Sequence, residues 1–200
     1  MHTENDENNK SMNKPLLVVV TGTPASGKTT LAHILAAKIN CPVLSRDKFK
    51  EGYLNTLNLA HNHLDKATDV HVNETFFEAT DLLISKGISI IIEAAFQDKL
   101  WRPKLLNFLH KAEVRIIICR TNVQLIKARF TNRFSNDPNR EKYHGDKSIS
   151  LSGEEFASLT KNYKPVNIDA PTLQVDTTHN YNPDIEEIIK FIRLKTSQNK

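Results

Sequence analysis

Short apolar runs alternate with amphipathic stretches along most of this chain. Five runs of leucine and β-branched residues predict strands at 16–21, 43–45, 88–93, 114–119 and 172–176. Apolar residues at a period near 3.6 predict helices at 28–40, 69–86, 100–111, 123–134 and 183–196, with a loop or an irregular helix at 55–65. The capping box Ser152-x-x-Glu155 predicts a further helix that ends at about residue 162. This alternation predicts an α/β fold in three layers, with a mostly parallel five-stranded sheet and helices on both faces. Ligands of such sheets bind beyond the carboxyl ends of the strands.

The turn between the first strand and the first helix matches the pattern G-x-x-x-x-G-K-[ST] of phosphate-binding loops. The pattern covers Gly22, Thr23, Pro24, Ala25, Ser26, Gly27, Lys28 and Thr29. We expect these residues to bind the nucleotide, together with Thr30 and Arg129. Glycines allow successive backbone N–H groups to turn toward phosphate oxygens, and the helix N-terminus carries a partial positive charge. A chance match is disfavoured because strand, loop, lysine, hydroxyl and helix occur in the required order.

This loop predicts a nucleoside triphosphate and Mg²⁺ as cofactors. We expect the nucleotide to be ATP, although the loop pattern itself does not distinguish ATP from GTP. Lys28 would bind the β- and γ-phosphates of the nucleotide. The hydroxyl of Thr29 would bind Mg²⁺, with Glu93 or Asp47 acting through water.

Charged residues follow the next three predicted strands and are expected at the same edge of the sheet. Asp47 follows the second strand, Glu93 ends the third, and Arg129 and Arg133 lie one turn apart on the helix after the fourth. Phosphoryl transfer needs a carboxylate that deprotonates the acceptor hydroxyl and cations that neutralise the moving group. We therefore predict that Asp47, Lys28, Arg129, Arg133 and Glu93 are catalytic.

Each of these residues also has a structural interpretation. Asp47 would cap the following helix, Glu93 would form an ion pair at a strand end, and the two arginines would lie on a solvated helix face. Either Asp47 or Glu93 remains open as the general base. The polar segment after residue 134 has the composition of a flap, in which further phosphate contacts are expected from Arg140, His144 and Lys147.

The length of 200 residues suits one domain, which we place at 15–197 with a lid at about 134–151. Residues 1–14 are acidic and rich in asparagine, and we expect them to form a disordered tail. They lack the pattern of a signal peptide, so we expect the protein to be cytoplasmic. The apolar runs are too short to span a membrane. The two cysteines, Cys41 and Cys119, are expected as free thiols, and His61, His63 and His71 as solvated side chains rather than metal ligands.

Together these motifs resemble the small P-loop kinases of the adenylate-kinase-like branch. Within that branch the chain is similar to the group that includes the kinase domain of polynucleotide kinase, chloramphenicol phosphotransferase and zeta toxins. The motifs that carry the resemblance are Gly22 to Thr29, Ser45 to Phe49, Glu93 to Phe96, Arg129-x-x-x-Arg133, and Val175-Asp176-Thr177. The resemblance implies a five-stranded core with an Arg-bearing lid, in which Asp47 accepts the proton of the acceptor hydroxyl and Val175 to Thr178 pack beside the adenine.

Two motifs that are linked to the phosphate acceptor in this group have a different sequence in this chain. The third strand of polynucleotide kinase ends in an aspartate-threonine pair, whereas this one ends in Glu93-Ala94. Zeta toxins have His-Pro shortly after the aspartate, whereas this chain has Glu51-Gly52-Tyr53. Neither a nucleic acid nor a sugar nucleotide is therefore specifically indicated as the acceptor.

Three functions follow from these observations. The first is an ATP-dependent kinase that phosphorylates a hydroxyl of a small molecule. The second is a 5′-hydroxyl polynucleotide kinase, which is favoured by the basic segment 120–147, with seven Lys/Arg and three Asp/Glu residues, and disfavoured by the scarcity of aromatic residues for base stacking. The third is a nucleotide-binding ATPase that acts as a switch on a partner protein. The sequence leaves the acceptor and the oligomeric state open.

Overall fold

The computed structural model describes residues 14–136, 140–144, 158 and 161–194 of the 200. The predicted tail at 1–14 therefore lies almost wholly outside the described residues. The same holds for most of the predicted lid at 134–151 and for the first turns of a helix predicted after Ser152.

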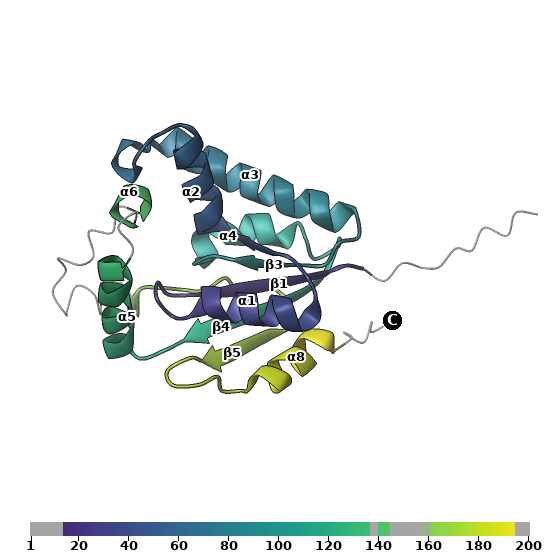
Figure 1. Cartoon of the computed structure of the whole chain (residues 1–200). Coiled ribbons are helices and arrows are strands. Elements are labelled where there is room, and N and C mark those ends of the chain that lie inside the picture. Colours follow the sequence, from purple (N-terminus) through teal and green to yellow (C-terminus); the bar gives the residue numbers. More distant parts are fainter. Residues whose placement is uncertain (1–13, 137–139, 145–157, 159–160, 195–200) are drawn as a thin grey trace, which may run out of the picture.

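Five parallel strands form one sheet in the order β2-β3-β1-β4-β5. Their bounds are β1 Leu16–Gly22, β2 Val43–Ser45, β3 Ile90–Glu93, β4 Glu113–Arg120 and β5 Thr172–Asp176. The predicted α/β fold is thus confirmed. With β1 in the centre, the loops that follow β1, β3 and β4 lie side by side at the carboxyl edge of the sheet, where α5 and α6 are also found (Figure 1).

Helices cover both faces of the sheet (Figure 1). Their bounds are α1 Lys28–Ile39, α2 Arg46–Thr56, α3 Lys66–Ser85, α4 Asp98–Leu106, α5 Val123–Asn136, α6 Arg140–His144 and α8 Ile185–Arg193, with a short 3₁₀ helix η1 at His61–His63. Helices α1 and α8 pack on one face, whereas α3 and α4 pack on the other. None of the helices in the described part of the chain has the length and apolar character needed to cross a membrane.

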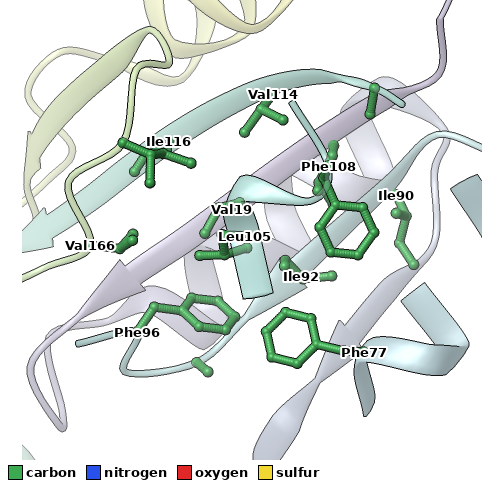
Figure 2. Close-up of a cluster of buried hydrophobic side chains, with 14 of the residues drawn as sticks. Val19, Phe77, Ile90, Ile92, Phe96, Leu105, Phe108, Val114, Ile116 and Val166 are labelled. Atoms are coloured by element: carbon green, nitrogen blue, oxygen red, sulfur yellow. The ribbon is translucent and has the colours of Figure 1, made fainter. Parts of the chain in front are cut away.

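Each face of the sheet has its own hydrophobic core. On the α3 and α4 face, aromatic rings dominate, and Figure 2 shows Phe77, Phe96 and Phe108 gathered around Leu105 over the sheet. Val166, from the segment that leads to β5, packs against the same cluster. Because the side chain of Phe96 is fully buried in this core, the loop after β3 is anchored directly beside the carboxyl edge.

Several helix ends differ from the sequence prediction. Helix α3 begins at Lys66 instead of 69, because the Asp65 side chain caps it by accepting a hydrogen bond of 2.6 Å from the backbone of Thr68. The helix predicted at 100–111 spans only Asp98–Leu106, although the apolar stripe continues through Phe108. The segment that we interpreted as a loop or an irregular helix contains the end of α2 and η1.

Candidate functional site

The loop between β1 and α1 requires glycine at two positions. A β-carbon at Gly22 would lie 2.5 Å from Ser26 Oγ and 2.6 Å from the carbonyl oxygen of Cys119, so no larger residue fits there. Gly27 has a φ of +82°, in the left-handed region that side chains disfavour. The motif is therefore folded as a tight turn that leads into α1.

Two polar side-chain atoms at this loop have no hydrogen-bond partner within the described part of the chain. Of the residues that the structure describes, two have buried side-chain polar atoms without a hydrogen-bond partner, Ser26 (Oγ) and Arg129 (Nη1). Arg129 Nη1 would lie 3.6 Å from a β-carbon at Gly27, beside the N-terminus of α1. That N-terminus has no side-chain cap and no acidic residue in its first turn. Unsatisfied donors at a helix N-terminus fit the phosphates of a nucleotide.

The lysine of the loop is paired with the carboxylate that ends β3. Lys28 Nζ lies 3.8 Å from Glu93 Oε1 and donates to the carbonyl of Thr23 at 3.4 Å. Both side chains are buried, and Ser45 at the end of β2 donates a hydrogen bond of 2.8 Å to Glu93 Oε2. The ion pair anticipated for Glu93 is therefore present, and it involves the predicted phosphate-binding lysine.

Asp47 lies in the first turn of α2 at the same edge of the sheet. Its side chain is 51% exposed, and its Oδ1 is 3.9 Å from Arg46 Nη1. The N-cap of this helix is Ser45, so the interpretation of Asp47 as the capping residue is wrong. Arg46 is held in turn by Asn73, at 2.8 Å, and by Asp69 of α3. Asp47 thus has a fixed cation on one side and solvent on the other.

Helix α5 packs directly on the phosphate-binding loop. Its Ile126 and Phe130 bury Ala25, while Arg129 Nη2 donates to the carbonyl of Thr177 at 2.7 Å. Thr177 follows β5 and donates its hydroxyl to the carbonyl of Ser26 at 2.6 Å. Arg129 is therefore located at the loop, between α5 and the turn after β5.

The remaining predicted site residues lie on α5 and in the predicted flap. Arg133 is half-buried on α5, one turn beyond Arg129. In the predicted flap, His144 ends α6 and its Nε2 lies 3.0 Å from Glu51 Oε1 of α2. Arg140 begins α6, whereas Lys147 lies outside the described residues.

Thr29 is the residue of the loop that would bind Mg²⁺. Thr29 is half-buried in the first turn of α1, and Thr30 beside it is exposed. Within the described ranges, no group of three or more His, Cys, Asp or Glu side chains could hold a metal ion. This arrangement fits Mg²⁺ as kinases bind it, through one or two protein oxygens and the phosphates of the substrate.

Two hydroxyls at the base of the loop were missed by the sequence analysis. Thr21 is fully buried directly before Gly22, and its hydroxyl lies 2.6 Å from that of Tyr163. A threonine at the end of an apolar strand is a weak signal, and nothing around Tyr163 in the sequence indicates its location. Tyr163 also lines a cavity of about 460 Å³ between Thr23, the end of β4 and the start of α5.

The sequence matches the family model of the zeta toxins over residues 2–185. The chain belongs to the zeta toxin family. This family is one of the three in the P-loop kinase group named from the motifs, so the resemblance is confirmed. A comparison with curated proteins gives no significant match.

Solved structures share the fold of this zeta toxin family member. A candidate kinase from Chloroflexus aurantiacus is 24% identical with a TM-score of 0.78, over 92% of this chain and 100% of that one. A sugar kinase from Janibacter sp. is 19% identical with a TM-score of 0.59, over 90% and 94% of the two chains. The APS kinase of Mycobacterium tuberculosis, solved with AMPPNP and APS, is 16% identical with a TM-score of 0.59, over 91% and 99%. At these identities the likeness concerns the fold.

Proposed function

We propose that this protein transfers the γ-phosphoryl group of Mg-ATP to a hydroxyl of a small molecule. The observation that supports it best is the set of unpartnered donors of Ser26 and Arg129 around the loop that carries Lys28. Asp47 follows β2 and Glu93 ends β3 at the same edge. A phosphate-binding loop with two carboxylates nearby suits phosphoryl transfer.

In this reaction the acceptor oxygen forms a bond to the γ-phosphorus while the bond from that phosphorus to the β,γ-bridging oxygen breaks. ADP leaves with the bonding electrons, and the hydroxyl proton passes to a carboxylate. Lys28 would exchange its contact with Glu93 for the phosphate oxygens, and Arg129 and Arg133 would neutralise the charge of the moving group.

We assign the general base to Asp47 rather than Glu93. Asp47 is half exposed and can reach an incoming hydroxyl, whereas Glu93 is 2% exposed and already accepts a hydrogen bond from Ser45. Glu93 would instead hold Lys28 in place and contribute to Mg²⁺ binding through water. Because ATP and reduced thiols are both found in the cytoplasm, we expect the protein to act there.

The test is a screen of the purified chain with γ-labelled ATP, Mg²⁺ and a panel of hydroxyl-bearing metabolites, with Lys28→Met as the matched control. We expect a labelled product that the variant forms at least about a hundredfold more slowly, as for the loss of a transition-state contact worth roughly 3 kcal/mol. If no compound in a broad panel accepts the label, the small-molecule kinase is wrong.

A 5′-hydroxyl polynucleotide kinase is the second candidate, because the excess of basic residues at 120–147 would suit a nucleic-acid backbone. Oligonucleotide affinity that falls steeply with salt, together with labelling of 5′-hydroxyl ends, would support it. Absent or salt-insensitive binding would exclude it.

A further inference from the structure

The phosphate-binding loop is attached to its two neighbouring strands in different ways. Toward β4, main-chain pairing continues as far as Gly22, which lies opposite Cys119. Toward β3, pairing ends at Val20 opposite Glu93, followed by one hydrogen bond of 3.3 Å from the backbone of Ala94 to the carbonyl of Val20. Beyond that point the connection between β1 and β3 continues through side chains.

Thr21, Phe96 and Tyr163 form a closed ring of hydrogen bonds at this point. The backbone N–H of Phe96 donates to Thr21 Oγ1 at 2.9 Å, and Thr21 Oγ1 lies 2.6 Å from the Tyr163 hydroxyl. The Tyr163 hydroxyl lies 3.3 Å from the carbonyl of Phe96, which can only accept. One assignment of hydrogens satisfies all three contacts: Phe96 donates to Thr21, Thr21 to Tyr163, and Tyr163 to Phe96.

The partners of Tyr163 are rigidly held. Thr21 and Phe96 are fully buried, and the Phe96 ring points into the cluster that also contains Val166 (Figure 2). The backbone of Val166 donates to the carbonyl of Phe96 at 2.9 Å, and the carbonyl of Lys164 accepts from the backbone of Asp98 at 3.0 Å. The Tyr163 hydroxyl is therefore fixed between two anchored segments.

We propose that Tyr163 is a positioning residue that fixes the β3 side of the phosphate-binding loop and so sets the placement of Lys28 against Glu93. Lys28 belongs to the loop that starts at Gly22, and Glu93 ends the strand that leads to Phe96. The hydroxyl ring is thus the short bridge between the two segments. The inference deepens the proposed function, and it rests on that function only for its effect on nucleotide binding.

The test uses Tyr163→Phe, which keeps the ring and removes the hydroxyl. The matched control is Thr80→Val, because the buried hydroxyl of Thr80 donates only within α3, to the carbonyl of Phe76 at 2.8 Å. Amide hydrogen exchange of peptides covering 17–31 and 90–98 should become about fivefold faster in Tyr163→Phe, the factor for one net hydrogen bond. In Thr80→Val, exchange of these two peptides should stay unchanged.

A second measurement is the dissociation constant of Mg-AMPPNP by calorimetry, well below the unfolding temperature. Tyr163→Phe and Thr21→Val should each weaken binding by about fivefold, and the double variant by little more than either alone, because both remove the same ring. Thr80→Val should bind as the wild type does, even where its unfolding temperature falls.

The outcomes separate the two proposals. Unchanged exchange in both peptides of Tyr163→Phe, or an effect equal to that of Thr80→Val, would overturn the role of Tyr163. A wild-type chain that binds no nucleotide would overturn the proposed function, while the exchange measurement would still decide the role of Tyr163.

Discussion

Glu93 and Lys28 form a buried pair of charges at the end of a hydrophobic strand. The two atoms nearest each other are 3.8 Å apart, and the other carboxylate oxygen accepts from Ser45. Removing two charges from water costs several kcal/mol per ion, so such a pair is weak evidence of stabilisation. The pair lies beside the unpartnered side-chain atoms of Ser26 and Arg129, which supports the proposal that Lys28 binds phosphate.

The buried hydroxyl of Tyr163 should make folding stability depend on high pH. Burial raises the pKa of Tyr163 from 10.0 to about 12. Between these two pH values the phenol stays protonated in the folded chain but already ionises in the unfolded chain. The contribution of Tyr163 to folding stability is therefore fully present below pH 10 and is lost as the pH rises through 12.

The measurement is the free energy of unfolding in urea, compared between the wild type and Tyr163→Phe. The difference should shrink between pH 10 and pH 12. Cys119, whose pKa burial also raises to about 12, is present in both proteins, so only its electrostatic interaction with the phenol differs between them. A difference that stays constant over this range would show that the phenol is not buried as described.

The residues of the site were predictable to different extents. The loop from Gly22 to Thr29 is contiguous, so its chemistry could be identified without the fold. Asp47 and Glu93 needed only the rule that parallel strands end at one edge. Tyr163 is separated from Thr21 by 142 positions, and only the packing of the segment before β5 brings the two hydroxyls together.

At the scale of elements, hydrophobic periodicity located the helices, while caps and buried polar contacts set their ends. Helix α8 begins after Asp184, which forms a capping box with Glu187 that we did not predict from the sequence. At its other end, the nearly fully buried Arg115 of β4 donates to the carbonyl of Leu194 and, at 3.0 Å, to that of Val114. A cation at a helix C-terminus is favourable for the helix dipole.

The capping box should contribute measurably to stability. Asp184→Ala removes the acceptor of the 2.9 Å hydrogen bond from the Glu187 backbone. We expect the free energy of unfolding in urea to fall by about 1 kcal/mol. Asp169→Ala, at an exposed position before β5, is the control and should change it by less than about 0.5 kcal/mol. Equal effects of the two variants would contradict the capping role.

At the scale of the whole molecule, the sheet order brings distant parts of the sequence to one edge. The order β2-β3-β1-β4-β5 places the ends of β2 and β3 on one side of the phosphate-binding loop, and α5 follows the strand on its other side. The cavity beside Thr23 lies toward β4 and α5, away from Asp47. We therefore expect the acceptor hydroxyl on the β3 side of the loop, between Asp47 and Lys28.

The most direct test of this account compares Asp47→Asn with the wild type. Two quantities are measured, the dissociation constant of Mg-ATP by calorimetry and the rate of phosphoryl transfer to the acceptor found in the screen. Loss of the general base should slow transfer by about a hundredfold or more, while the dissociation constant changes less than about threefold. Transfer or ATP turnover at the wild-type rate in Asp47→Asn would contradict a kinase that uses Asp47 and would favour a nucleotide-dependent switch.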